Sequence, residues 1–254
     1  MLPNSFKPKK LYNLIRLGSN NDGGYLVEKD SHKKTKTLFS FGLGNDWHFE
    51  RMFINDSKEK KRAICFDCKI NKFFYLKNLI KSLEKLIFLK SNFNKFYSDC
   101  LSNINLFFFL FNKRLSYYER SIAVNKKTDT ISSLLNEFKP DLPVFLKIDI
   151  EGCEYRLLDE IINYQDLLSG VVIEFHNTDI HMDRIKNFIR KTKLTLVHFH
   201  ANNADYLDKN NNPITFEMTF ANSPNEIKGN VLIPHRLDQK STSKNPDHEV
   251  FFED

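Results

Sequence analysis

The sequence has few of the features that mark secreted or membrane-spanning proteins. It contains only four cysteines in 254 residues, without the paired spacing of a secreted disulfide scaffold, so we expect a reducing compartment. No stretch approaches the roughly 18 consecutive apolar residues that a membrane-spanning helix requires. The N-terminus has no apolar signal segment. These absences predict a soluble, cytoplasmic protein.

Several motifs of well-known enzyme classes are also missing from the sequence. It has no P-loop, no GxSxG nucleophile elbow and no protein-kinase signature. Cys65 and Cys68 form a CxxC pair, but no second pair and no nearby pair of histidines completes a zinc site. We therefore expect the two thiols to be incidental core residues.

The net charge of +6 is unevenly distributed along the chain. Residues 69–120 hold ten lysines and arginines against three acids, a surplus of seven, so the remainder of the chain carries −1. Such a local basic field favours an anionic partner, for example a nucleotide-linked substrate, a phosphorylated glycan, an acidic membrane surface or nucleic acid. An ordinary solvated face is the alternative.

Outside this basic segment, the apolar pattern alternates between strands and helices. A hairpin over residues 11–30 is predicted from an Asp-Gly turn between apolar runs. Strands are predicted over residues 37–41, 63–66, 144–148, 171–175, 194–199 and 214–220, and helices over residues 47–53, 131–138, 154–162 and 182–191. This alternation predicts an α/β fold with a doubly wound, mostly parallel sheet in a single domain spanning residues 1–254. The polar tail after Pro234 is expected to fray.

The basic segment, residues 69–120, is predicted to be a largely helical insertion. Its first part has apolar residues at helical spacing, while Lys77, Lys81 and Lys85 stack on another face. We expect the apolar side of this helix to pack on its own domain, and peripheral membrane contact is the alternative. The apolar cluster at residues 106–111 is compatible with either a strand or a helix.

A glycine loop at residues 41–46 follows the first predicted core strand and precedes a helix. Gly42 and Gly44 allow a tight turn and a close approach of the backbone to a ligand. Asp67, at the end of the next strand, stands where an acid accepts the ribose hydroxyls of a bound nucleoside. The loop lacks the third glycine of a dinucleotide fingerprint. A nucleoside site is therefore favoured over a dinucleotide site, and a plain strand–helix turn is the alternative.

Acidic and imidazole side chains follow the ends of three later strands. Asp149 and Glu151 follow one strand, Glu174 and His176 lie on one side of the next, and His200 ends a third. Ligands of open α/β sheets bind beyond the carboxyl ends of the strands, so this clustering predicts an active site. The alternatives are capping or salt-bridged carboxylates and hydrogen-bonded structural histidines.

These motifs resemble a known family. The chain resembles FkbM-type S-adenosylmethionine-dependent methyltransferases in four segments: LKIDIEG (residues 146–152), VVIEFH (171–176), DGGY (22–25) and HANN (200–203). The resemblance implies a Rossmann-like class I methyltransferase fold with S-adenosyl-L-methionine as the cofactor. The residues that it implies for cofactor binding are Phe41, Gly42, Gly44, Asp46, Asp67 and Asp149. Ser40 stands before the loop where methyltransferases commonly have an acid.

The resemblance also implies roles for the polar strand ends. A neutral alcohol is a poor nucleophile until a base or a metal removes its proton, so Asp149, with His176 or His200, would orient and deprotonate the acceptor. Glu151, Glu174 and Tyr25 would contact the acceptor. A divalent metal held by Asp149, His176 and His200 is a further hypothesis, since carboxylate and imidazole ligands suit such ions.

Members of this family mostly methylate oxygen atoms, often on sugars. We therefore expect an O-methyltransferase in polysaccharide biosynthesis, whose acceptor is a nucleotide-linked sugar or a surface-glycan precursor and is anionic because of the basic insertion. A phosphoryl or amide acceptor in a glycan-modification pathway is the alternative. A nucleic-acid-binding role for the insertion ranks lower, because its aromatic residues fall in apolar clusters, and no nucleic-acid partner is expected. The sequence makes no prediction of oligomeric state.

Overall fold

The computed structural model describes residues 1–44, 46–56, 60–68, 74–87, 94, 96–97, 100–101, 104, 109, 112–123 and 129–253. Much of the predicted insertion, including most of the apolar cluster at residues 106–111, lies outside the described residues.

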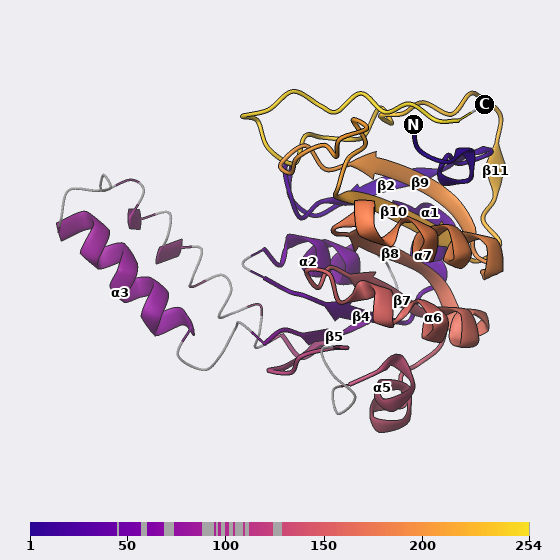
Figure 1. Ribbon diagram of the computed structural model, residues 1–254. Helices are drawn as coiled ribbons and strands as arrows, with labels where there is room; N and C mark the ends of the chain where they lie inside the picture. Colours follow the sequence, from indigo (N-terminus) through magenta and orange to yellow (C-terminus); the bar gives the residue numbers. More distant parts are fainter. Residues whose placement is uncertain are drawn as a thin grey trace.

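A seven-stranded sheet forms the centre of the molecule (Figure 1). Its order is β6-β5-β4-β7-β8-β10-β9. The strands are β4 (Thr37–Phe41), β5 (Arg62–Phe66), β6 (Leu115–Tyr118), β7 (Val144–Ile148), β8 (Leu168–Phe175), β9 (Thr195–Ala201) and β10 (Phe216–Ala221). All neighbours pair in parallel except β10, which is antiparallel to both β8 and β9. The six predicted core strands and the mostly parallel, doubly wound sheet are thus confirmed.

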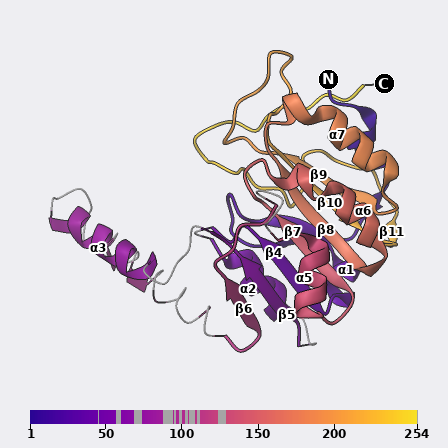
Figure 2. The same cartoon turned by 60° about the horizontal axis from the view of Figure 1, so that its bottom comes forward.

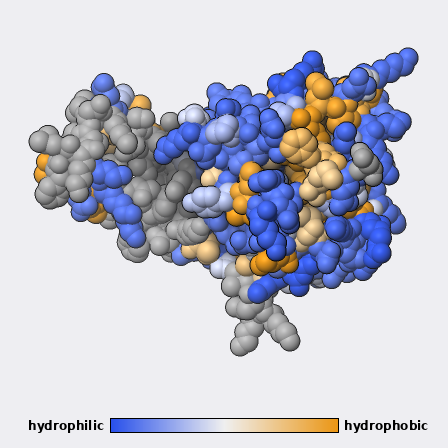
Figure 3. Space-filling model, turned by 45° about the horizontal axis from the view of Figure 1, so that its top comes forward, coloured by the Kyte–Doolittle hydropathy of each residue, from blue (hydrophilic) through white to orange (hydrophobic). Residues whose placement is uncertain are grey.

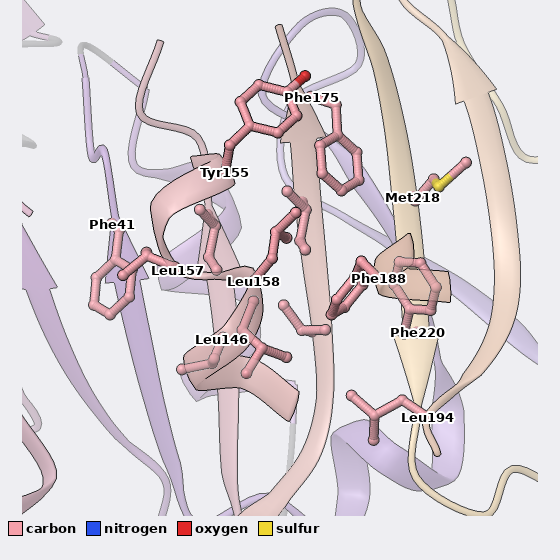
Figure 4. Packing of buried hydrophobic residues seen from close by; sticks show 14 of the residues in the cluster. Phe41, Leu146, Tyr155, Leu157, Leu158, Phe175, Phe188, Leu194, Met218 and Phe220 are labelled. Atoms are coloured by element: carbon pink, nitrogen blue, oxygen red, sulfur yellow. The ribbon is translucent and has the colours of Figure 1, made fainter. Parts of the chain in front are cut away.

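Two hydrophobic layers cover the two faces of the sheet. Successive strand residues alternate between the layers, so that Phe39 and Phe41 belong to one cluster and Leu38 to the other. One layer is completed by α5 (Ile131–Phe138), α6 (Leu158–Tyr164) and α7 (Thr178–Lys191), and the other by α2 (His48–Asn55). The short 3-10 helices η2 (Glu154–Arg156) and η3 (Gln165–Leu167) flank α6. Figure 4 shows the first layer, where side chains of η2, α6 and α7 meet those of β7, β8 and β10.

The predicted hairpin is present as a small separate sheet. Its strands β2 (Leu14–Leu17) and β3 (Tyr25–Glu28) pair antiparallel, and β3 leads into α1 (Lys29–Lys34). Thr219 of β10 donates its hydroxyl to the carbonyl of Leu26 at 2.6 Å. The hairpin therefore lies against the main sheet and brings Tyr25 to it.

The C-terminal tail docks on the domain, and the prediction that it frays was wrong. Leu2 and Phe252 form a parallel bridge, and Phe252 packs against the core beside Phe199. The amide of Asn203 donates to three tail carbonyls, those of Thr242, Asn245 and Pro246. In Figure 1 the yellow tail accordingly runs along the top of the molecule. The N-terminal helix η1 (Asn4–Phe6) and the strand pair β1 (Leu11–Tyr12) and β11 (Glu226–Ile227) complete this region.

Helix α3 (Phe74–Ile87) confirms the predicted basic amphipathic helix, but its surroundings differ from the expectation. Figures 1 and 2 show it standing away from the sheet. Ile80, Leu83 and Ile87 are 47–65% exposed. Lys77, Lys81 and Lys85, on the other face, are exposed as well. For these described side chains, the expected packing of the apolar face on the domain was wrong. The strand β6 also falls within residues 69–120 and is the edge of the main sheet.

The surface is mostly hydrophilic on the face shown in Figure 3, with one band of apolar residues. Exposed large apolar side chains include those of Tyr206, Leu232 and Phe251. None of the helices in the described part of the chain is both long and apolar enough to cross a bilayer.

Candidate functional site

A pocket opens at the carboxyl ends of β4, β5 and β7. From β4 the chain continues to β5 on one side, and β7 lies on the other side of β4. This reversal of strand order is a topological switch point, and open α/β sheets bind their ligands at such points. The described residues that line the pocket are Gly42, Gly44, Phe66, Asp67, Cys68, Arg120, Ser121, Ile122, Asp149, Ile150 and Glu151. The glycine loop, Asp67 and the Asp149 segment, which the resemblance groups as cofactor-binding residues, therefore line one pocket.

Gly42 lets the backbones of β4 and β7 approach closely at the base of the pocket. Its φ is +83°, and a Cβ atom at this position would lie 1.7 Å from the carbonyl oxygen of Asp149. The Asp149 amide in turn donates to the carbonyl of Phe41 at 3.0 Å. Any side chain at residue 42 would separate the two strand ends, so only glycine fits here.

Asp67 lies across the pocket from the Asp149 segment. Its Oδ2 accepts a hydrogen bond of 2.6 Å from the amide of Gly44. This contact fixes the carboxylate beside the loop, while Phe66, Ile122 and Ile150 supply apolar walls. An acid at this position with apolar neighbours suits a nucleoside, whose ribose hydroxyls donate and whose base is flat and apolar on its faces. The residues present thus fit the nucleoside part of S-adenosylmethionine.

Arg120 is a pocket residue that the sequence analysis did not single out. Its guanidinium forms two hydrogen bonds of 2.7 Å with Glu137 and lies 5.4 Å from the ring centre of Tyr118. The hydrogen bonds to Glu137 raise the pKa of Arg120. Because its partner lies on α5, no local sequence pattern connects the two residues.

Beside the pocket, Asp149 forms a cluster with three buried polar side chains, those of Tyr25, Glu174 and Asn202. The Tyr25 hydroxyl lies 3.2 Å from Asp149 Oδ2 and 2.9 Å from Glu174 Oε2. The Asn202 amide donates to the second oxygen of Glu174 at 2.8 Å. Tyr25 and Glu174 are almost fully buried, whereas the Asp149 side chain is 29% exposed. Asp149 is therefore the member of the cluster that a second substrate can reach.

The Tyr25 hydroxyl cannot donate to the carboxylates of Asp149 and Glu174 at the same time. One phenol hydroxyl donates a single proton, yet it lies between two carboxylates. Burial, together with the charge of Asp149, raises the pKa of Glu174 to about 8. A Glu174 carboxyl that holds its proton can donate to the Tyr25 oxygen, which leaves the Tyr25 hydroxyl proton for Asp149.

His176 is held by Glu154, a buried acid that the sequence analysis placed only at the start of a helix. One oxygen of Glu154 accepts from the amide of His176 at 2.7 Å and lies 3.2 Å from its Nδ1, and the other accepts from Gly152 at 2.9 Å. Burial lowers the pKa of His176, but the hydrogen bond to Glu154 and the surrounding carboxylates more than offset it, raising this pKa to about 9. Nε2 lies 4.0 Å from oxygens of Glu151 and Glu174. The imidazole is therefore cationic near neutral pH and faces the acidic cluster.

Lys147 is a second buried charge that the sequence analysis missed. Its ammonium donates to the carbonyl of Gly42 at 2.6 Å and lies 3.7 Å from carboxylate oxygens of both Glu50 and Asp149. Burial opposes the charge of Lys147, yet the neighbouring carboxylates raise its pKa. Lys147 lies in β7 and Asp149 directly follows it. This two-residue spacing was the available signal, because it puts both side chains on the same side of the extended chain.

His200 lies apart from this group. Its Nδ1 is 3.7 Å from Glu217 on the neighbouring strand, and it lines another pocket, formed with the tail near His248. Burial is again outweighed by carboxylates, chiefly Glu217, and the pKa of His200 rises to about 9. Among the described residues no three histidine, cysteine or acidic side chains form a metal-binding group. The hypothetical metal set of Asp149, His176 and His200 is therefore not assembled.

The remaining predicted site residues have other surroundings. The Phe41 side chain is fully buried in the core, and only its backbone meets the Asp149 segment. Asp46 accepts hydrogen bonds from the amide of His48 at 2.9 Å and from its ring at 2.7 Å, one residue before the assigned N-cap of α2. Glu151 lines the pocket and is exposed.

Comparisons with solved structures show distant similarity to methyltransferases. A precorrin-6y C5,15-methyltransferase from Geobacter metallireducens has 10% identity and a TM-score of 0.39, with 75% of this chain and 82% of that chain covered. An rRNA methylase from Streptococcus thermophilus has 10% identity and a TM-score of 0.37, with 76% and 92% covered. The M. capricolum protein TrmK, solved with S-adenosylhomocysteine, has 11% identity and a TM-score of 0.36, with 77% and 67% covered. No curated protein matches the chain.

The comparison with protein families covers most of the sequence. Residues 2–207 match the family described as the methyltransferase FkbM domain. The sheet order and the pocket at its switch point agree with this match. The chain therefore belongs to the FkbM methyltransferase family and is an S-adenosylmethionine-dependent methyltransferase with the Rossmann-like class I fold.

Proposed function

We propose that the protein is an O-methyltransferase whose acceptor is a carbohydrate, either a nucleotide-linked sugar or a precursor of a surface glycan. The observation that carries this proposal is the Tyr25–Asp149–Glu174 cluster beside the cofactor pocket. A hydroxyl acceptor needs a base for its proton, and Asp149 is the partly exposed carboxylate of the cluster.

The residues of the two sides of the cleft have separate tasks in this proposal. Gly42, Gly44 and Asp67 hold the cofactor, which supplies an electrophilic methyl group when bound. Asp149 takes the proton of the acceptor hydroxyl, and Tyr25 orients the carboxylate through its hydrogen bond. His176, being cationic, acts as a donor to acceptor oxygens and not as the base.

Several polar side chains near Asp149 suit an acceptor with more than one hydroxyl. Glu151 is exposed at the pocket, and the ring of His176 lies within 4.0 Å of both Glu151 and Glu174. Such a group of polar and charged side chains offers hydrogen bonds to the several hydroxyls of a sugar, and an apolar acceptor could not form these bonds. This difference favours a carbohydrate.

An anionic acceptor is supported by the lysines of α3. Lys77, Lys81 and Lys85 are exposed and stack along one face of the helix. We expect that reversing these three charges raises the Michaelis constant for the acceptor, most strongly at low salt, because long-range attraction between exposed charges is screened by ions. Steady-state kinetics at two salt concentrations measures this effect. An unchanged Michaelis constant would remove the basic helix from acceptor binding.

We also place the protein in the cytoplasm, where nucleotide sugars are available. All four cysteines are free thiols, and Cys65 is fully buried. Free thiols are compatible with a reducing compartment. Fractionation of cells that express the protein tests this placement.

The proposal is tested with a panel of nucleotide sugars and glycan fragments, with mass detection of the added methyl group. Phosphoryl and amide acceptors belong in the same panel, because a methylated phosphate or amide in place of a methylated hydroxyl would replace the proposed acceptor. Asp149→Asn keeps the size of the side chain and removes the base. We expect it to lower turnover by about 10²–10⁴-fold. Asp183→Asn, at an exposed position of α7, is the control and should leave turnover unchanged.

A further inference from the structure

A second cavity lies at the opposite end of the sheet from the methyl-transfer cleft. It has a volume of about 790 Å³ and is bounded by the N-terminal segment, α7 and the first residues of β9. Since β8 and β9 both run antiparallel to β10, Thr195 at the start of β9 lies at the amino ends of the parallel strands. Asp149 and Glu174 lie at the carboxyl ends. The cavity is therefore separate from the acceptor and cofactor pockets.

Five cationic side chains line this cavity: Lys7, Lys9, Lys10, Lys186 and Arg190. Two acids, Glu226 and Glu253, also line it, and Glu226 is 3.0 Å from the ammonium of Lys10. Within the part of the chain that the structure describes, no ion pair is recorded for Lys7, Lys9 or Lys186. The cavity thus carries an excess of positive charge that its own acids do not neutralise.

The backbone that carries the lysines is held by buried neighbours. Phe6 is fully buried and packs edge-on against Phe216 at 5.7 Å, and Pro8 is buried as well. Helix η1 contacts α7, which places Lys7 beside the turns of α7 that carry Lys186 and Arg190. Figure 2 shows the N-terminal segment beside α7. Because this backbone is anchored, the cations converge without the cost of ordering a free tail.

The walls between the cations are largely apolar. Tyr12 and Leu194 are buried, and Ile189 and Leu196 are partly buried, and all four line the cavity. An isolated surface patch of lysines has no such walls. A concave site with apolar walls and several cations fits a charged group with a non-polar substituent better than it fits simple counter-ions.

We propose that this cavity binds a phosphate or pyrophosphate ester. Lysine and arginine donate charge-assisted hydrogen bonds to phosphate oxygens, and a doubly or triply charged group matches the surplus of three positive charges that five cations and two acids leave in the cavity. The ester substituent lies against Leu194 and Leu196. The site does not take part in methyl transfer. It binds the protein to a phosphorylated molecule, while methyl transfer takes place in the cleft at the opposite end of the sheet. The proposal does not depend on the identity of the methyl acceptor.

The test measures binding of pyrophosphate to the full chain by calorimetry, and binding of vesicles with and without phosphatidylglycerol by flotation. The first probe represents a free phosphate ester, and the second a lipid headgroup. We expect saturable binding of pyrophosphate, of anionic vesicles or of both. Lys7→Glu/Lys186→Glu should weaken this binding about tenfold or more, because two attractive charges become repulsive.

The matched control is Lys209→Glu/Lys244→Glu, which changes the net charge equally at two exposed positions outside the cavity. It should have little effect, because exposed charges beyond about 10 Å are screened at 0.1 M salt. Each variant is accepted only if it still binds S-adenosylhomocysteine, and Lys186→Gln replaces the double variant if the latter does not fold. The proposal is overturned if the wild type binds neither probe, or if both double variants lose binding equally.

Discussion

The two sides of the cleft are held by different kinds of interaction. On the cofactor side, backbone geometry dominates: Gly42 lies against the carbonyl of Asp149, and the Gly44 amide binds Asp67. On the acceptor side, buried ionisable groups dominate, with Tyr25 between two carboxylates. The cofactor side should therefore be sensitive to an added carbon atom and insensitive to pH. The acceptor side should show the reverse.

The largest effect is expected from Gly42→Ala. Its Cβ would overlap the carbonyl of Asp149, with φ at +83°, and neither backbone can move without separating β4 from β7. We expect a loss of more than about 3 kcal/mol in the free energy of unfolding, together with loss of cofactor binding. Urea denaturation and calorimetry measure the two effects.

Gly44→Ala is the matched control for this change. Gly44 also has a positive φ, of +59°, but no atom lies within 4 Å of a Cβ at that position. Only backbone strain of about 1 kcal/mol is expected. If both variants lost the same stability, the close contact with Asp149 would not be what requires glycine at residue 42.

On the acceptor side, Glu154→Gln tests the hydrogen bonds by which Glu154 holds His176. The amide retains the size of the side chain but cannot accept from both Gly152 and His176 as the carboxylate does. We expect a loss of about 1–3 kcal/mol in the free energy of unfolding and a fall in the pKa of His176. Denaturation and an NMR titration of the imidazole check both, with Glu119→Gln at an exposed position as the control.

Glu174→Gln should change the pH dependence of stability. A carboxyl group whose pKa is raised to about 8 in the folded state binds its proton more tightly than in the unfolded chain. Its contribution is therefore fully present below the unfolded pKa of about 4.5 and is lost as the pH rises toward 8. We expect the wild type to lose more stability than Glu174→Gln between pH 5 and pH 8. Parallel pH profiles for the two proteins would show that Glu174 ionises normally.

Most of the sheet was predictable because each strand is a short apolar run. The predicted strand at residues 37–41 coincides with β4, and that at 144–148 with β7. The antiparallel direction of β10 was not predicted, because its burial on both faces gives it the same apolar pattern as a parallel strand. The docked tail was missed for another reason. The tail is attached by hydrogen bonds from Asn203 to its backbone carbonyls, and such bonds produce no periodic pattern of apolar residues in the sequence.

The site was predictable only in part for a similar reason. Gly42, Asp67 and Asp149 could be grouped because each follows a strand, and parallel strands end at one edge. The partners Glu50, Lys147 and Glu154 could not be paired, since their contacts join elements that are distant in the sequence. His200 was grouped with the site by its place at a strand end, but its nearest acid, Glu217, lies on the antiparallel strand.

The most direct test of the two-sided cleft is calorimetric titration of S-adenosylhomocysteine into the wild type, Asp67→Asn and Asp149→Asn. Asp67→Asn should weaken binding by about tenfold, because the amide loses the charged acceptor for the ribose hydroxyls. Asp149→Asn should bind the product about as tightly as the wild type, although its turnover is expected to be about 10²–10⁴-fold lower. Equal affinity of the wild type and Asp67→Asn, or loss of binding in Asp149→Asn, would contradict the division of the cleft into a cofactor side and an acceptor side.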